Sequence, residues 1–561
     1  MDRNFLFAIA LSFVVLTGWT MYERKMHPTP VGTSSAGDAS EPHSRGERAE
    51  GAPTTLPSAP APEPRSEARK AADAVPQVVA KGLEERIRIR TDLYDAELSS
   101  HGGGLTRFEL LRYDDPSRAG RPQVDLVTAG HGDVVLATAF GALGLGDLSR
   151  AGYEVERPNP LTVVFTRKQG GIQIRKTYLF KADDYLFRLR LEVDNGSDHI
   201  VEPTFRVAWP AVRQESADYS DYMAAAFTDG DVVREVISSS RSFFGMGGKG
   251  FDKEKLISSD VEWAGVMTRY FVAAIFPEVP AESRTRFDPI VPGKRVGIEI
   301  EQHKTAIPPG QHIDREYRIY LGPKEPARLG AVGAHFDQAI RGGWFPSLTA
   351  FFTRLLTETH KIIPNYGVAI ILITIVVRLL MAPLMARQMR SMKRMSALQP
   401  KVKELQAKYP DDKQKQSEAM MSVYKEAGVN PLAMMTGCLP MFLQMPVFLG
   451  FYYALQGAIQ LRQQPFVGWI NDLSMPETLF VLPGLHLPVR VLPLLMGGAM
   501  VLQQKMTPSS MDPNQARMMM TVMPVMFTFM FYQFASGLVL YWLVSTLLGI
   551  LQQVVINRNK S

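Results

Sequence analysis

Five apolar runs crowd the last 200 residues of this 561-residue chain and constrain its fold more than any other feature. Because the bilayer core offers no water to bond peptide groups, a run that crosses it must form a helix that satisfies its own backbone. We predict membrane helices over Tyr366–Leu384, Cys438–Ala458, Val491–Gln503, Met518–Phe534 and Gly537–Ile556. The Val491 run is short for a span, and a start near Leu485 would lengthen it.

The N-terminus supplies a sixth apolar run, Asn4–Tyr22, which has no formal charge and is just long enough to span. No small-residue cleavage site precedes Glu23, which favours an uncleaved anchor within residues 1–26 over a signal peptide. Residues 27–81 hold nine prolines and no Phe, Tyr or Trp, so we predict a disordered linker there.

Residues 82–340 follow a different period, with apolar side chains at alternate positions, which is typical of β-strands. Gly170-Gly171 and Asp183-Asp184 favour turns between alternating runs. We therefore predict a three-stranded meander over 161–165, 172–180 and 185–193, and further strands near 270–276, 295–302 and 316–321. This many short strands indicates a large all-β sandwich. His101, beside three glycines, is interpreted as part of a turn.

The loop 385–432 carries ten Lys and Arg against five acidic residues, whereas 459–482 carries only Arg462. Basic loops stay in the cytoplasm, so we expect this loop and both termini inside and the β domain in the periplasm of a bacterium. Pro400 and the turn at Pro410 divide the loop into a helical hairpin. Its basic cluster could contact lipid, ribosomal RNA or an acidic partner, or simply be solvated: Arg387, Arg390, Lys393 and Arg394.

Residues 341–363 contain a helical apolar stripe, which predicts an amphipathic helix on the outer membrane surface. The alternative is a helix in the core of the β domain. The stripe comprises Leu348, Phe351, Phe352, Leu355 and Leu356.

Arg378 lies inside the first C-terminal run, where a charge costs about 2.5–3.5 kcal/mol. It could snorkel to the headgroups, but we favour a water-filled cavity. Thr374 lies one turn earlier, and other spans offer Gln444, Gln503, Gln504, Gln552 and Gln553. Because none of the five runs contains Asp or Glu, the cavity suits an anionic guest and does not suit a proton relay.

Methionine is concentrated in residues 364–561, which hold 22 of the 28. Its flexible, polarizable side chain suits surfaces that accept many partners, although ordinary packing explains any single methionine.

The sequence excludes an intramolecular disulfide and shows no motif for ATP or metal binding. Cys438 is the single cysteine, so no intramolecular disulfide forms. Neither a Walker A sequence nor an HExxH motif occurs, and we expect no catalytic residue, metal or cofactor.

Three motifs carry a family resemblance: TIVVRLLMAPLMARQMRSMKRM, YKEAGVNPLAMMTGCLPMFLQMPVFLGFYYAL and FASGLVLYWLVSTLLGILQQ. Over Trp344–Arg558 the chain resembles the YidC/Oxa/Alb family of membrane protein insertases. The resemblance implies the form with six transmembrane helices, five of them an insertase core at 364–558, and a periplasmic β-supersandwich similar to sugar mutarotases. A longer stretch before the third span, Leu432–Gly437, departs from the family and leaves that helix's start open.

The resemblance also implies a function without covalent chemistry: helping hydrophobic segments enter the bilayer, alone or beside the Sec translocon. Arg378 matches the family's groove arginine, Thr374 and Trp542 match positions lining the groove, and Gln444 and Met445 fall in the third-span motif. Implied partners are nascent membrane proteins, the Sec translocon and the lipid bilayer, with the ribosome and the signal recognition particle receptor as further candidates. Two alternatives from other classes are a solute transporter and a membrane-tethered carbohydrate-binding protein.

Overall fold

A computed structural model describes residues 83–558 of the chain with internal gaps. The gaps are 116–122, 131–132, 142, 144, 146–147, 215–220, 240–250, 259, 341–344, 410–411, 427–438, 484–486 and 508–512. The predicted anchor and linker, residues 1–81, lie outside the described residues.

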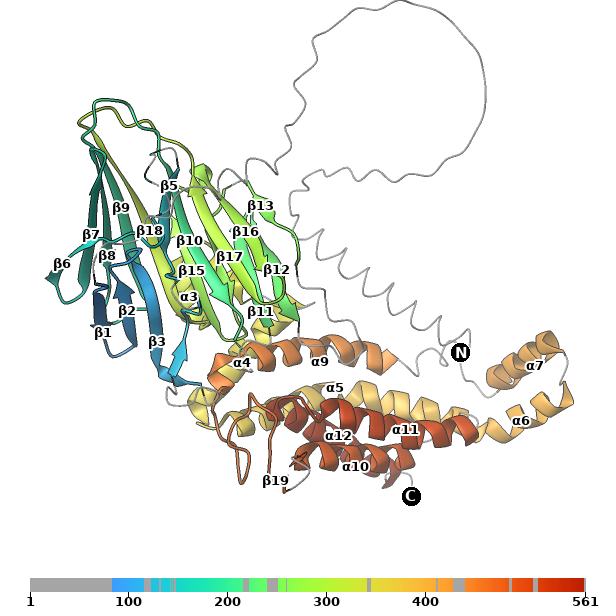
Figure 1. Cartoon of the computed structure of the whole chain (residues 1–561). Coiled ribbons are helices and arrows are strands. Elements are labelled where there is room, and N and C mark those ends of the chain that lie inside the picture. The colour runs from blue at the N-terminus through green and yellow to red at the C-terminus, as the bar shows by residue number, and fades with distance from the viewer. Residues whose placement is uncertain are drawn as a thin grey trace, which may run out of the picture.

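The first half of the described chain is a β domain, and the second half is a group of helices (Figure 1). The largest sheet has nine strands in the order β12-β11-β14-β15-β18-β9-β8-β7-β6. A second sheet has the order β13-β16-β17-β10-β5, and a third has the order β1-β2-β3-β4. The strands of the three sheets are β1 Arg86–Arg90, β2 Tyr94–Ser99, β3 Gly104–Asp114, β4 Gln123–Asp125, β5 Ala137–Gly141, β6 Glu154–Asn159, β7 Thr162–Gln169, β8 Ile172–Leu179, β9 Leu186–Asn195, β10 Thr204–Val212, β11 Asp221–Thr228, β12 Asp231–Ser239, β13 Lys255–Ile257, β14 Trp263–Met267, β15 Phe271–Pro277, β16 Ser283–Val291, β17 Arg295–Gln302 and β18 His312–Pro323.

The predicted meander is confirmed as β7, β8 and β9, which pair antiparallel in sequence order. Gly170 and Gly171 join β7 to β8 with φ of 61° and 78°. Two consecutive positive φ angles suit a tight hairpin turn, and glycine adopts them without steric cost. The predicted strands near 270–276, 295–302 and 316–321 are also present, as β15, β17 and β18.

One continuous apolar core contains residues of all three sheets, which confirms the all-β reading of this domain. Its largest members include Trp209 and Trp263, both fully buried. His101 lies outside the named strands, in an isolated bridge to Gly152 beside two glycines of positive φ, and its amide donates to Ser99 Oγ at 3.0 Å, as expected for a turn.

All five predicted C-terminal runs are helical. The helices after the β domain are α3 Pro326–Val332, α4 Pro346–Ile362, α5 Tyr366–Ala397, α6 Gln399–Lys408, α7 Lys413–Glu426, α9 Leu439–Gly457, α10 Val491–Met506, α11 Pro513–Phe531 and α12 Ser536–Arg558. Short 3-10 turns lie at Pro280–Glu282, Phe336–Ala339 and Ile459–Leu461. The suggested start of α10 near Leu485 is wrong, because Phe480–Leu482 and Leu487–Val489 pair as the hairpin β19–β20.

Two stretches are each long and apolar enough to cross a bilayer, among the helices that the structure describes: Tyr366–Arg387 and Ser536–Ile556. Met520–Phe531 is a shorter apolar stretch. With 16 residues, α10 falls below the roughly 20 that a perpendicular span needs. The described helices share an apolar core. Because only two of them contain a stretch of spanning length, the count of six transmembrane helices remains a prediction.

Helix α4 follows the predicted amphipathic segment, but its inner face is narrower than the predicted stripe. Phe352 and Leu356 are buried in the apolar core of the helical part, whereas Phe351 is 56% exposed. Phe352 packs against Phe451 of α9 at 5.1 Å between ring centroids. The helix thus belongs to the helical core, and the alternative that it lies in the core of the β domain is wrong.

The loop predicted to form a helical hairpin contains α6 and α7, which follow the end of α5. Helix α5 continues unbroken to Ala397, so the first basic residues extend the membrane helix and do not form a separate arm. The break falls at Leu398, and Pro400 sits in the first turn of α6, where proline is tolerated. The Asp412 carboxylate accepts a hydrogen bond from the Lys415 amide at 3.0 Å and caps α7. Figure 1 shows α6 and α7 projecting away from the other helices.

Candidate functional site

Helices α5 and α12 lie side by side and run parallel, which sets the frame for the predicted site. Contacting pairs rise in residue number along both helices at once, as expected for parallel helices. The successive pairs are Ile370 with Gly537, Arg378 with Ser545, and the Ala382 carbonyl with Gln552. Both helices therefore begin at one end of the bundle and finish at the other.

Arg378 is held between these helices by a hydroxyl group. Its Nε and Nη2 donate to Ser545 Oγ at 2.8 and 2.6 Å. A Cβ at position 549 would lie 2.6 Å from Gln503 Nε2 and 3.9 Å from Arg378 Nη1, so Gly549 leaves room for both. Across the described residues no carboxylate pairs with this guanidinium, so no counter-charge cancels its field, and arginine keeps its proton in proteins.

The polar contact continues toward α9. The buried Tyr541 hydroxyl, one turn before Ser545, bonds Ser545 and lies close to Arg378. Gln444 Nε2 of α9 donates to the same hydroxyl at 3.1 Å. A chain of polar groups thus links α5, α12 and α9 through the middle of apolar helices.

The other predicted site residues lie around this chain in different ways. Trp542 packs edge-on against Phe448, with ring centroids 4.8 Å apart, and at a tilt of 47° against Phe531, with centroids 5.1 Å apart. Thr374 is buried and donates to the Ile370 carbonyl at 2.6 Å, so its hydroxyl is used within α5. Met445 is 36% exposed. The structure links Arg378 and Gln444 through Tyr541. It packs Trp542 among aromatic rings and buries Thr374 within the helix core.

Sequence reasoning missed Tyr541 and Ser545. A signal for them existed, because Tyr541, Ser545, Gly549 and Gln552 recur at helical intervals along a run that is otherwise apolar.

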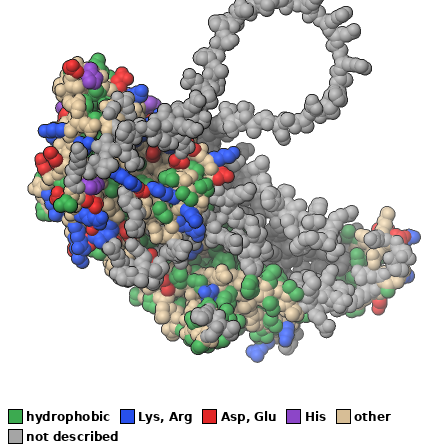
Figure 2. All heavy atoms as spheres, viewed as in Figure 1, with side chains coloured by type: hydrophobic (Ala, Val, Ile, Leu, Met, Phe, Trp, Pro, Cys, Tyr) green, Lys and Arg blue, Asp and Glu red, His purple; other side chains and the backbone are tan. Residues whose placement is uncertain are grey.

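The outer faces of the same helices are apolar. Figure 2 shows hydrophobic side chains gathered over the helical part and charged ones over the β domain. The exposed fractions range from 49 to 76% for Val376, Leu379, Leu380, Leu547, Leu551 and Val555. Such surfaces suit contact with lipid, so Arg378 is a cation set between helices whose outer faces are hydrophobic.

The predicted basic cluster lies along the last turns of α5, roughly 13 Å or more beyond Arg378 at ~1.5 Å per residue. Arg387, Arg390 and Arg394 are exposed, and Lys393 is half-buried. The cluster is therefore separate from the polar chain.

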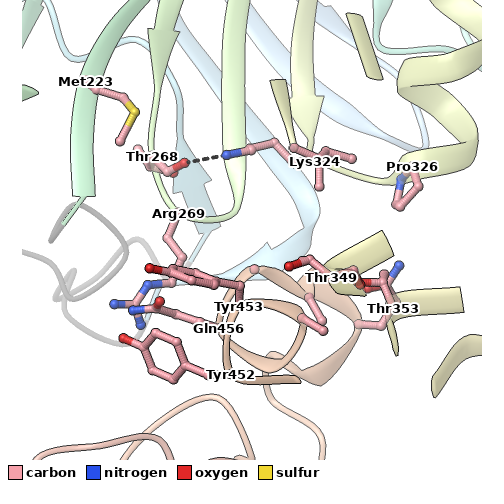
Figure 3. Close-up of a pocket in the computed structure, with 15 residues that line it drawn as sticks. Met223, Thr268, Arg269, Lys324, Pro326, Thr349, Thr353, Tyr452, Tyr453 and Gln456 are labelled. Carbon is pink, nitrogen blue, oxygen red and sulfur yellow. Dashed lines mark hydrogen bonds between the residues drawn. The ribbon is translucent and has the colours of Figure 1, made fainter. Parts of the chain in front are cut away.

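Two cavities lie elsewhere, between the β domain and the helices. One of about 400 Å³ is lined by Arg269, Lys324 and Tyr453 among others (Figure 3). The other, of about 730 Å³, includes Arg269, Arg490 and Tyr532.

Comparison with known proteins covers both parts of the chain. Residues 86–357 match the family described as the YidC periplasmic domain, and residues 358–561 match the 60Kd inner membrane protein family. A relative from Syntrophus aciditrophicus, named membrane protein insertase YidC, is 33% identical over 578 residues, covering 100% of both chains. A relative of the same name from Geotalea daltonii is also 33% identical, covering 100% of this chain and 99% of its own. An active YidC insertase crystal structure aligns with 85% of this chain and 94% of its own, at 18% identity and a TM-score of 0.34.

Proposed function

Because the chain belongs to the family of YidC membrane protein insertases, we propose that Arg378 and its polar neighbours receive the hydrophilic part of a client protein during insertion. The family acts at the inner membrane, carries a periplasmic domain, and places nascent membrane proteins in the lipid bilayer without catalysing a bond change. The proposal concerns how the residues of this chain do so.

The observation that carries the proposal is the pairing of Arg378 with a hydroxyl group. A carboxylate partner would cancel most of the guanidinium's field, whereas Ser545 leaves the charge in place. In surroundings of low dielectric that charge attracts an acidic segment more strongly than it would in water. A groove at Arg378, open to cytoplasm and lipid, would thus shorten the apolar distance that a client's tail must cross.

Thr374, Gln444, Met445 and Trp542 would line this groove. Exposed Met445 and the Trp542 ring offer apolar contact to a client helix, while Gln444 and Tyr541 continue the polar side. The free energy for release comes from burying the client's own apolar surface in lipid, roughly 25 cal/mol per Å².

We further propose six transmembrane helices, with both termini in the cytoplasm and the β domain in the periplasm. The parallel course of α5 and α12 supports this arrangement, because both then end at the face that carries Arg387 and Arg558. The opposite face contacts the β domain: Gln463, just after α9, donates to the Asp114 carbonyl at 2.9 Å.

The hairpin of α6 and α7 would be the cytoplasmic receiver of clients. Arg387, Arg390, Lys393 and Arg394 at its base suit an acidic or anionic partner. The Sec translocon, the ribosome and the signal recognition particle receptor are the proposed partners beyond the clients themselves.

The test is insertion of a client with an acidic periplasmic tail into reconstituted vesicles. Arg378→Lys keeps the charge and should retain most activity, whereas Arg378→Glu repels the tail and should lose at least about tenfold in rate. Arg354→Glu makes the same change on the exposed face of α4 and serves as the matched control. Equal activity of Arg378→Glu and Arg354→Glu would refute the proposed role.

A further inference from the structure

The region where the β domain meets the helices contains two cavities that share one residue. Figure 3 shows Arg269, between β14 and β15, extending toward Tyr453 and Gln456 of α9. The same arginine lines the second cavity, beside the hairpin β19–β20 and the first residues of α10. The two cavities therefore adjoin at Arg269, and their volumes, about 400 and 730 Å³, fall in the range of roughly 300–1,000 Å³ for small-molecule sites.

The charge of both cavities has one sign. Arg269, Lys324 and Arg490 line them, and no Asp or Glu is among the described lining residues. Lys324 Nζ donates to the Thr268 carbonyl at 3.2 Å, so one of its partners is a neutral oxygen. Three cations lining adjoining cavities favour an anionic occupant.

Arg490 lies at the wall of the larger cavity and has one donor without a hydrogen-bond partner. Its Nη1 donates to the Tyr532 carbonyl, and the guanidinium lies 5.0 Å from the Tyr532 ring centroid. Its Nε is buried and has no hydrogen-bond partner in the structure. Glu477, two residues after the cavity-lining Met475, forms no ion pair with Arg490 in the described structure; its oxygens accept from Trp469 Nε1 and the Leu492 amide, both at 2.7 Å.

The surroundings place this cationic pair of cavities beside an apolar surface. Phe480 and Val481 of β19 and Leu487 of β20 are 50, 53 and 51% exposed, and Leu487 also lines the larger cavity. Phe529 of α11 lines it too and is 63% exposed. Tyrosines also line both cavities, with Tyr452 and Tyr453 in the smaller one and Tyr532 in the larger. Cations and tyrosines above exposed apolar side chains are typical of the headgroup region of a bilayer.

We propose that these adjoining cavities bind the phosphodiester headgroup of an anionic glycerophospholipid from the periplasmic leaflet. The phosphate lies between Arg269 and Arg490, and the acyl chains run along Phe529 and the β19–β20 hairpin. The lipid then joins the β domain to the helical core, because Arg269 belongs to the first and Arg490 to the second. The inference rests on the topology given under Proposed function, but it needs neither Arg378 nor a client.

The experiment measures lipid binding to the full-length protein in neutral detergent by native mass spectrometry. Phosphatidylglycerol, phosphatidylcholine and inorganic phosphate are added separately. Phosphatidylglycerol should bind best, and Arg269→Gln/Arg490→Gln should weaken its binding at least about tenfold, because two charge-assisted contacts are lost. Arg269→Lys/Arg490→Lys keeps both charges and should retain most of the binding, which separates loss of charge from misfolding.

Arg188→Gln/Arg354→Gln is the control, since it removes two exposed positive charges outside both cavities. If this control weakens phosphatidylglycerol binding as much as Arg269→Gln/Arg490→Gln does, the loss reflects net charge and not the cavities, and the proposal is overturned. Equal binding of the two lipids, or displacement of phosphatidylglycerol by equimolar inorganic phosphate, would overturn the assignment to an anionic lipid. Because no client is present, failure here leaves the insertion test of Arg378 unaffected.

Discussion

Lys176 of β8 offers the sharpest test of the energetics of the β domain. Strand alternation directs it inward with Ile174 and Tyr178, and it is fully buried. Its Nζ donates to the carbonyls of Gly102 and Leu136 at 3.0 and 3.1 Å, and in the described part of the chain it forms no ion pair. Burial without a counter-charge lowers the pKa of Lys176 from its ordinary 10.5 to about 7.

The sign of the resulting pH dependence follows from proton binding. Between pH 7 and 10.5 the unfolded chain keeps the Lys176 proton while the folded chain has released it, so stability rises with pH. The slope is close to one proton, which gives a gain of about 2 kcal/mol from pH 7 to pH 9. Measurements stay below pH 9.5 because burial also raises the pKa of Tyr185 to about 12, and such tyrosines reduce stability above pH 10.

Replacement by methionine removes the charge and keeps the length of the side chain. At pH 7 it relieves about 4 kcal/mol of charge burial and loses two hydrogen bonds of about 1 kcal/mol each. Lys176→Met should therefore stabilise the domain by about 2 kcal/mol at pH 7 and be close to neutral at pH 9.

The assay is urea unfolding of residues 83–340 at pH 7 and pH 9, followed by the fluorescence of the buried Trp209 and Trp263. Lys168→Met, on an exposed position of the neighbouring strand, is the control and should keep the wild-type pH dependence. If wild type and Lys176→Met show the same change in unfolding free energy between the two pH values, Lys176 is not a buried neutral amine and the reasoning is wrong.

Three further predictions concern insertion. Ser545→Ala removes the hydroxyl that holds Arg378, and insertion of an acidic-tailed client in vesicles should slow severalfold, whereas Ser422→Ala in the exposed α7 should not change the rate. Deleting residues 85–320 should leave insertion largely intact, because the polar chain, the methionines and the hairpin all lie later in the sequence; total loss in a stably expressed deletion would contradict this. Removing residues 399–421 should slow client capture without lowering thermal stability, because the cut spares α5, α9 and α12; a collapse in stability would make the hairpin structural, and no change in either quantity would make it passive.

Local patterns predicted much of this fold because they depend on neighbouring residues. Alternation between 161 and 193 specifies both faces of three strands, and the glycine pair specifies their turn. Pro400 was predicted to interrupt a helix because it lacks an amide hydrogen, and the break lies two residues before it. The start of α10 at Val491 was predicted, but the suggested earlier start near Leu485 was wrong, because a short strand pair and a helix end look alike in an apolar stretch containing proline.

The partners of the site could not be predicted in the same way. Arg378 was recognised from its charge within an apolar run and from the family resemblance, but Ser545 lies 167 residues later, and its contact depends on how α5 packs on α12. The cavities between the β domain and the helices were even less predictable from sequence, since Arg269 and Arg490 come from different parts of the fold. Contacts between residues so far apart in sequence depend on tertiary packing, which cannot be read from the hydrophobic period or the local composition.

Lys176, Arg378 and Arg490 each donate to neutral oxygen atoms, and their surroundings determine what each can do. Lys176 bonds two carbonyls in a closed core, where no anion can approach, so it releases its proton near neutral pH. Arg490 bonds a carbonyl at the wall of a cavity and keeps a donor unused. Arg378 bonds a hydroxyl between helices whose outer faces are apolar. A carboxylate beside either arginine would cancel the charge that attracts an anion, so neutral acceptors suit the positions at which we propose that a client or a lipid binds.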